Sequence, residues 1–186
     1  MEVNTRMTVI IENIPVLPLR GLLVYPSMVL HIDVGRERSI AALEEAMLKD
    51  SRVFLLTQKD LQIESPKKQD LYDIGTIVKV KQMLKLPNGT LRVLVEGENR
   101  GKLIKYSEGK TFTTANVEVH EDPKHKDPET EALMRTLLSQ FEKYAKMSNK
   151  ITTETIDSVI DIDEPGRLTD LVSSHLPFKI AEKQEI

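Results

Sequence analysis

The hydrophobic period of this chain changes once, at a polar break over residues 121–127 with the sequence EDPKHKD. Before the break, apolar and polar side chains alternate in several short runs, a period of two that is typical of β-strands. After the break, apolar side chains recur every three or four residues, which is typical of helices that face a core. The pattern predicts a β-rich domain over residues 1–120, a linker over 121–127 and a helical subdomain over 128–186.

The front part contains several candidate strands and one helix. Met28–Val34 alternates, so its even-numbered residues should face a core, whereas the uninterrupted apolar run Val53–Leu56 is typical of a strand covered on both faces. Between them, Arg36–Lys49 repeats its apolar residues at helical spacing. Two further strands are expected over Lys102–Tyr106 and Phe112–Val119.

A hairpin is expected around the sequence LPNGT at residues 86–90. Pro87 has no N–H to donate to a ladder, which disfavours a two-residue Asn-Gly turn. A three-residue loop would place Leu84 opposite Arg92 and mix the two faces of the sheet. We therefore expect a four-residue loop, Pro87–Thr90. The pairs that follow from this loop are Leu86–Leu91, Leu84–Val93, Met83–Leu94 and Lys81–Glu96.

The back part begins with a clear helix start. Asp127-Pro128-Glu129 offers an N-cap carboxylate, a proline at the first helical position and an acid in the first turn. A helix over Pro128–Met147 should follow, then one over Thr153–Asp161 and one that opens at Asp163-Glu164-Pro165. The last helix, Phe178–Ile186, has no stop signal, so we expect the subdomain to be truncated in that helix.

Composition narrows the functional class. The chain has no cysteine and no apolar run of the roughly 18 residues that span a bilayer, and its start lacks a secretion signal. We therefore expect a cytoplasmic protein without a membrane partner.

Residues 67–110 carry ten basic and five acidic side chains, a local charge of +5 in a chain of net charge −3. Such a stretch could contact phosphates, but lysines on the wet face of a sheet explain it more simply.

Candidate catalytic motifs are incomplete. Gly109-Lys110-Thr111 resembles the end of a phosphate-binding loop, but Ile104 stands where that loop needs its first glycine. His120 and His125 are not at helical metal-ligand spacing, and no serine lies in a recognised nucleophile motif. We expect no catalytic residue, no metal site and no cofactor, and we do not expect this chain to be an enzyme by itself.

The candidate binding residues lie in the segment between Arg20 and Met28. Gly21 and Pro26 interrupt an otherwise apolar run there. One interpretation is a strand end packed on the core. The other is an exposed apolar patch that binds polypeptides. The residues proposed for that patch are Leu22, Leu23, Tyr25, Pro26 and Met28.

Several motifs in order resemble the opening of bacterial ATP-dependent Lon proteases, over nearly the whole chain. The segments that carry the resemblance are Pro15–Gly21, Val24–Met28, Val34–Ile40, Ile74–Thr76, Lys85–Thr90, Val93–Gly97, Pro165–Asp170 and Lys183-Gln184. The resemblance implies an α+β fold: a PUA-like β pseudo-barrel of about six strands with one packed helix, followed by an all-helical arm. His31 departs from the family, where many members carry proline, which leaves the edge behaviour of Met28–Val34 open.

The resemblance also implies a function. In the family this region engages unfolded or damaged protein substrates and supports a ring-shaped oligomer in protein quality control and stress response, and the ATPase and the Ser–Lys peptidase lie further along the full chain. The alternatives are an RNA-binding PUA-like module and an adaptor for one folded partner. We expect weak dimerisation of the isolated chain through uncovered apolar helical surface.

Overall fold

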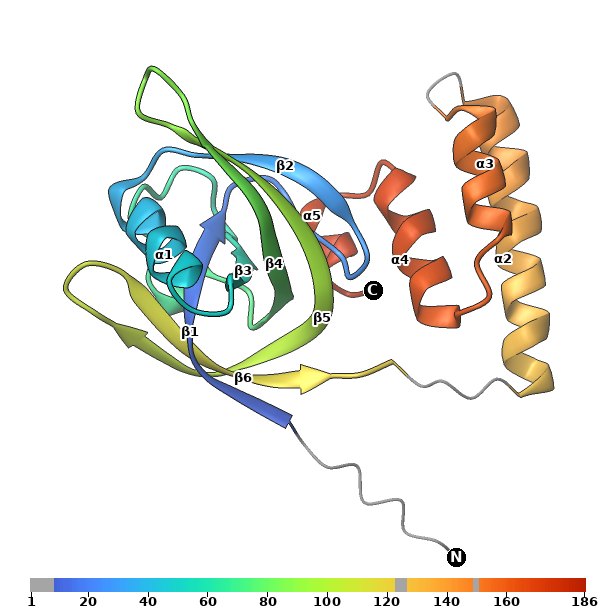
Figure 1. The fold of residues 1–186 in the computed structure, drawn as a ribbon. Coiled ribbons are helices and arrows are strands. Elements are labelled where there is room, and N and C mark those ends of the chain that lie inside the picture. The colour runs from blue at the N-terminus through green and yellow to red at the C-terminus, as the bar shows by residue number, and fades with distance from the viewer. Residues whose placement is uncertain (1–8, 123–126, 149–150) are drawn as a thin grey trace, which may run out of the picture. The chain divides into compact units, whose positions relative to one another are not determined.

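The computed structural model describes residues 9–122, 127–148 and 151–186, and the chain divides into two compact units, Met1–Glu121 and Asp122–Ile186 (Figure 1). The front unit holds the sheet and one helix, and the back unit holds the remaining helices. The predicted α+β fold class, with a six-stranded β part and helices behind it in the sequence, is confirmed.

The front unit is one curled sheet of six strands. Their bounds are β1 Val9–Leu19, β2 Val29–Val34, β3 Arg52–Thr57, β4 Ile74–Lys85, β5 Leu91–Glu108 and β6 Thr113–His120. The strand order is β2-β5-β4-β3-β1-β6, and β5 also pairs with β6. Because β5 is 18 residues long, its first half pairs with β2 and its second half reaches β6, which closes the sheet on itself. β2 has β5 as its only strand neighbour in the described part of the chain, so β2 is an edge strand.

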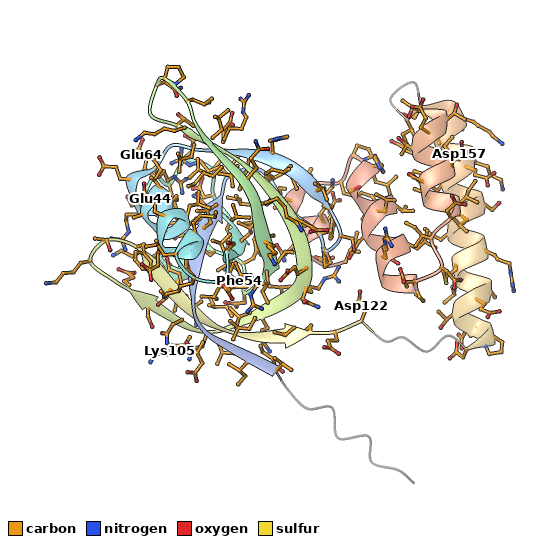
Figure 2. All side chains as sticks on the ribbon, viewed as in Figure 1. Glu44, Phe54, Glu64, Lys105, Asp122 and Asp157 are labelled. Carbon is orange, nitrogen blue, oxygen red and sulfur yellow. The ribbon has the colours of Figure 1, made fainter. Side chains whose placement is uncertain are left out.

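The front core has two parts, one on each face of β3. Val53 and Leu55 belong to the part covered by helix α1 (Glu37–Met47), whereas Phe54 and Leu56 belong to the other. Figure 2 shows Phe54 inside the curled sheet, where it is fully buried. The predicted burial of Val53–Leu56 on both faces is confirmed, as is the inward alternation of Ile32 and Val34 in β2.

The predicted register of the β4–β5 hairpin is wrong. Leu84 pairs with Arg92, the pairing of a three-residue loop, and Leu86 N donates to Thr90 O at 2.8 Å. Gly89 takes a φ of 82°, the left-handed conformation that a three-residue hairpin loop uses. A bulge between Val80 and Gln82 then restores the alternation that the short loop disturbs. Leu84, predicted on the dry face, is 55% exposed.

The later strands differ less from expectation. The separate strand expected over Lys102–Tyr106 is the second half of the continuous strand β5. The strand expected over Phe112–Val119 is β6, shifted by one residue at each end. Bulges in the pairing of β5 with β4 and with β6 let one long strand bend, which a period-two pattern does not reveal.

The back unit contains helices α2 Pro128–Met147, α3 Thr153–Ile160, α4 Pro165–His175 and α5 Ile180–Lys183. Asp127 Oδ1 accepts a hydrogen bond from Thr130 N at 2.8 Å, which is the predicted N-cap. Phe141 from α2, Val159 from α3 and Leu168 from α4 form the core of this unit.

The last helix is shorter than expected. A helix over Phe178–Ile186 was predicted, but α5 is a single turn that ends at Lys183, and it buries no residue. Isolated helical turns are unstable without a packed apolar face, so the segment does not extend further as a helix.

Candidate functional site

The segment from Arg20 to Met28 is a tethered loop between β1 and β2. Main-chain atoms along its length form hydrogen bonds with three different strands of the curled, closed sheet, which we call the barrel. The loop is therefore held to the barrel rather than free to move. The bonds are Thr57 Oγ1 to Leu22 O at 2.8 Å, Thr76 Oγ1 to Val24 O, Ser27 N to Gly97 O at 2.9 Å and Gly97 N to Met28 O at 2.9 Å.

A tight turn lies at the far end of this loop. Met28 N donates to Tyr25 O at 3.3 Å, Pro26 is the second residue of the turn and Ser27 has a φ of 63°, which together fit a type II turn. β5 passes directly under the turn at Gly97, where an added Cβ would lie 2.5 Å from Tyr25 O. The turn and the strand therefore fit only because residue 97 has no side chain.

The five predicted binding residues differ in exposure. Tyr25 is 3% exposed, so the expectation that it belongs to an exposed patch is wrong: the fastened loop and its turn leave the ring inside, where burying a large apolar surface is favourable. Leu22 and Met28 are half-buried against the front core. Leu23 and Pro26 are also only partly exposed, and the neighbouring Val29, which was not predicted, is 59% exposed. The binding role of these side chains stays a prediction.

A cavity of about 680 Å³ opens beside the end of β1. It lies where segments distant in sequence meet: the end of β1, the start of α1, the loop before β4, and the end of β5 with the start of β6. Figure 2 shows Glu64, from that loop, at the surface of the front unit. The charged lining residues are Arg20, Arg36, Glu37, Arg38, Glu64, Lys67 and Glu108, and the other side chains that matter below are Val16, Pro18, Pro66 and Tyr106.

Three arginines in this lining fasten loops to the barrel. Arg36 contacts the buried side chain of Gln58, which is 1% exposed and itself donates to Asp60 O and Ile63 O. The arginine bonds are Arg20 Nη2 to Ile63 O at 3.2 Å, Arg36 Nη2 to Gln58 Oε1 at 2.5 Å and Arg38 Nη2 to Gly109 O at 3.1 Å. The walls of the cavity are thus fixed by side chain hydrogen bonds.

Arg36 has the most unusual environment of the three. Its Nη1 is buried and has no hydrogen-bond partner within the described residues. Burial lowers the pKa of Arg36 below its ordinary value, the positive charge of Arg20 lowers it further, and the carboxylate of Glu64 opposes both. The guanidinium remains charged, because arginine does not lose its proton in proteins. The arrangement favours a negatively charged group beside Arg36.

A second cavity of about 390 Å³ shares Pro18, Arg20, Arg36 and Ser39 with the first. Leu22 lines it, together with apolar residues of β1 and β2 and the side chains of His31 and Asp33. Asp33 is engaged by Arg92, at 2.8 Å and 2.9 Å, and this hydrogen-bonded pairing lowers the pKa of the Asp33 carboxyl. Leu22 is therefore a predicted binding residue that lines a cavity. The arginines that line the same cavity, Arg20 and Arg36, were not among the predicted binding residues.

Sequence reasoning missed Arg20, Arg36, Arg38 and Gln58. A usable signal existed: Arg20 follows β1 directly, Gln58 follows β3 directly, and Arg36 stands just after β2. Polar side chains at the ends of neighbouring strands are well placed to meet, and loops carried by a rigid scaffold often hold binding groups. The pairing of Arg36 with Gln58 could not be deduced, because β2 and β3 are not neighbours in the sheet and their ends meet only through its curling.

The other motifs serve as structure. Gly109-Lys110-Thr111 is the β5–β6 turn, where Gly109 N donates to Phe112 O at 3.0 Å. In the basic stretch, Lys81 Nζ lies 2.5 Å from the carboxylate of Glu96. His125 lies outside the described residues. Across the residues that the structure describes, no three histidine or acidic side chains form a cluster that could hold a metal ion. Within the same residues, no helix has the length and apolar character needed to span a membrane.

Comparison with known proteins gives consistent matches. Residues 13–186 match the family described as the ATP-dependent protease La (LON) substrate-binding domain. The chain is 55% identical over 176 residues to Lon protease 1 of Bacillus subtilis (strain 168) and 44% identical over 174 residues to Lon protease of Escherichia coli (strain K12), covering 94% of this chain in each case. It spans only 23% and 22% of the length of those relatives. Among solved structures, the N-terminal domain of a Mycobacterium avium complex Lon protease superposes with a TM-score of 0.65 at 25% identity, covering 93% of this chain and 88% of that one.

Proposed function

The chain belongs to the family of ATP-dependent protease La (LON) substrate-binding domains, and from this premise we propose that it engages unfolded or damaged polypeptides on behalf of a Lon-type protease. The family is defined by a substrate-binding domain and not by a catalytic one. In this proposal the chain holds the substrate, and the ATP-driven and peptide-cleaving steps belong to the remainder of the longer protein.

The observation that carries the proposal is the apolar surface of the tethered loop. Leu23 and Pro26 of the loop are partly exposed, and Val29, the first residue of β2, is 59% exposed. Each stands on a backbone that is fixed to the barrel. Gly21 brings Leu61, which is 51% exposed, close to the same loop, since an added Cβ would lie 3.6 Å from Leu61 Cδ2. Such a surface selects partners by hydrophobicity, which suits unfolded chains better than folded ones.

The expected affinity is low. Fully burying one such side chain contributes about 1.5–3 kcal/mol. Association costs remove much of that gain, although a fixed loop loses little freedom on binding. A dissociation constant on the order of tens to hundreds of micromolar follows for two or three buried side chains. Weak binding suits a domain that must release its substrate.

The test is a double substitution, Leu23→Ser with Val29→Ser, and its control is Leu48→Ser. Leu48 is 83% exposed and stands at the C-cap of α1, outside the loop. Binding of a reduced and alkylated, permanently unfolded protein is measured by fluorescence anisotropy. We expect the double variant to bind at least about fivefold more weakly and the control to bind like the parent. The free energy of unfolding should change by less than about 1 kcal/mol in both, because the positions are at the surface. Unchanged binding by the double variant would contradict the role of the loop.

Support of oligomeric assembly is the second part of the proposal. Helix α2 leaves Leu133 64% exposed and Met147 87% exposed, and uncovered apolar helical surface favours a partner. We expect weak dimers of the chain at millimolar concentration by light scattering, and a lower average mass for Leu133→Glu. A monomeric mass for the parent at that concentration would contradict this part of the proposal.

A further inference from the structure

We propose that the larger cavity binds a carboxylate group of the engaged polypeptide, and that Arg36 and Arg20 are the cationic residues that hold it. The inference rests on the proposed function, because it names the chemical group by which a polypeptide would be held beside the apolar loop. The carboxylate can be the C-terminal one or the side chain of an acidic residue near an apolar residue.

The first argument is an unused donor. Arg36 commits Nη2 to Gln58, whereas its buried Nη1 has no partner within the described residues. A guanidinium presents its donors in a fixed plane that matches the two oxygens of a carboxylate. A buried N–H without a partner is unfavourable. Once the Arg36 side chain turns Nη1 toward the cavity, an incoming carboxylate would satisfy a donor that the described residues leave open.

The second argument is the distribution of charge. The positive charge of Arg20 acts on Arg36, so an anion between the two would relieve their repulsion. The lining holds four basic side chains against three acidic ones, a net charge of +1. The acidic residues are Glu37, Glu64 and Glu108. One carboxylate matches this balance, whereas a doubly charged phosphate or a run of phosphates would be repelled by the three acids.

The third argument identifies the competitor. Among these acids, Glu64 is the one whose carboxylate favours the charged form of Arg36. Its side chain is exposed and belongs to a loop, so it can turn away toward water when a ligand carboxylate arrives (Figure 2). Removing the charge of Glu64 should therefore strengthen binding of the ligand, which is the opposite of what a structural role for this glutamate predicts.

The fourth argument is the shape of the cavity. A volume of about 680 Å³ falls in the range of small-ligand sites. Val16, Pro18, Pro66 and Tyr106 give it apolar walls. These walls suit an aliphatic or aromatic side chain next to a bound carboxylate. The preferred part of the polypeptide is therefore an acidic group beside an apolar residue.

The experiment uses N-terminally labelled peptides and the 186-residue chain. One peptide ends in Leu-Phe with a free carboxylate, a second is the same peptide as a C-terminal amide, and a third is amidated but carries Glu before Leu-Phe. We expect the free acid to bind at least about fivefold more tightly than the amide. Arg36→Gln should abolish that difference. Glu64→Gln should raise the affinity for the free-acid peptide by about two- to threefold. The matched control Arg135→Gln removes an exposed arginine from α2 and should change neither affinity.

The outcomes separate the alternatives. Tighter binding of the third peptide than of the plain amide would show that an acidic side chain serves as the ligand as well as a chain terminus. Equal binding of acid and amide by the parent would overturn the cavity proposal and leave the proposed function standing, whereas no binding of any peptide or unfolded protein would overturn both. Displacement of the free-acid peptide by inorganic phosphate, at phosphate concentrations below the dissociation constant of the peptide, would also overturn it. Because Arg36→Gln removes a bond to Gln58, the opposite effect of Glu64→Gln decides the case if the arginine variant fails to fold.

Discussion

Gly97 shows how one residue fixes the position of the tethered loop between β1 and β2. Its N–H and C=O both bond to the loop, and the space where a side chain would stand is occupied by the carbonyl oxygen of Tyr25. The loop is therefore positioned by a backbone-to-backbone approach that only glycine permits. The partly exposed Leu23 and Pro26 therefore stand on a backbone that this contact helps to fix.

We expect Gly97→Ala to lower the free energy of unfolding by about 2–3 kcal/mol, because a Cβ placed 2.5 Å from Tyr25 O must displace the turn. The measurement is urea unfolding followed by circular dichroism. Gly35→Ala is the matched control, since its Cβ would lie 3.7 Å from Thr90 Oγ1 at an ordinary contact distance. A loss as small as that of the control would mean that the loop is not held by this approach.

His175 gives the back unit a dependence on pH. Burial, together with the charge of Lys183, lowers the pKa of His175 below its ordinary value, and its ring lies 6.3 Å from that of Phe141. The unfolded chain therefore binds a proton at a higher pH than the folded unit does. The stability that comes from keeping His175 neutral is fully present above about pH 6.5, the ordinary histidine pKa. It is lost as the pH falls through the lower pKa of His175 in the folded unit.

We expect the melting temperature of the helical unit to fall between pH 7.5 and pH 5, and His175→Gln to reduce that fall. Thermal unfolding at fixed ionic strength measures it. A melting temperature that rises as the pH decreases over this range would contradict the sign of the shift.

Tyr25 marks the limit of sequence reasoning at the residue scale. Its neighbours Gly21 and Pro26 correctly indicate a turn-rich loop, but they do not say on which side of the loop a large ring will lie. That side is decided by bonds from Thr57, Thr76 and Gly97, which come from three separate strands. Arg36 was overlooked for a related reason, because its partner Gln58 follows β3, which is not a neighbour of β2 in the sheet.

At the scale of elements, local signals with a chemical mechanism were the most reliable. The N-cap at Asp127 and the helix over Pro128–Met147 follow directly from the sequence, and the structure agrees at both ends. The β4–β5 hairpin did not follow, because the alternation was assumed to be unbroken. A left-handed glycine at residue 89 and a bulge near Lys81 compensate each other, and a pattern of apolar residues does not distinguish the two solutions.

We expect Asp127→Ala to lower the free energy of unfolding of the back unit by about 1 kcal/mol, because the first turn of α2 loses its cap. Glu164→Ala is the matched control, since Glu164 is the N-cap of α4 but makes no side-chain capping bond. Urea unfolding of the two variants in parallel is the measurement. Equal losses would show that the Asp127–Thr130 bond contributes nothing specific.

At the scale of the whole molecule, the change of hydrophobic period predicts strands before the break and helices after it, and the structure has that order. The closure of the sheet into a pseudo-barrel was expected from the family resemblance and not from the hydrophobic pattern, because it depends on β5 pairing with β2, β4 and β6 at once. For a linker over 121–127, part of which lies outside the described residues, the prediction is that limited proteolysis cuts there first. First cuts within β4 or β5 would place the boundary elsewhere.

The central claim is that this domain engages unfolded polypeptide. The most direct measurement compares binding of the parent chain to one test protein in its native form and in its reduced, alkylated and unfolded form, with single-stranded RNA as a third ligand. We predict a dissociation constant of tens to hundreds of micromolar for the unfolded form, at least about tenfold weaker binding of the native form, and weaker binding of RNA than of the unfolded chain. Equal binding of native and unfolded protein, or tighter binding of RNA with a steep loss of affinity in salt, would contradict the account.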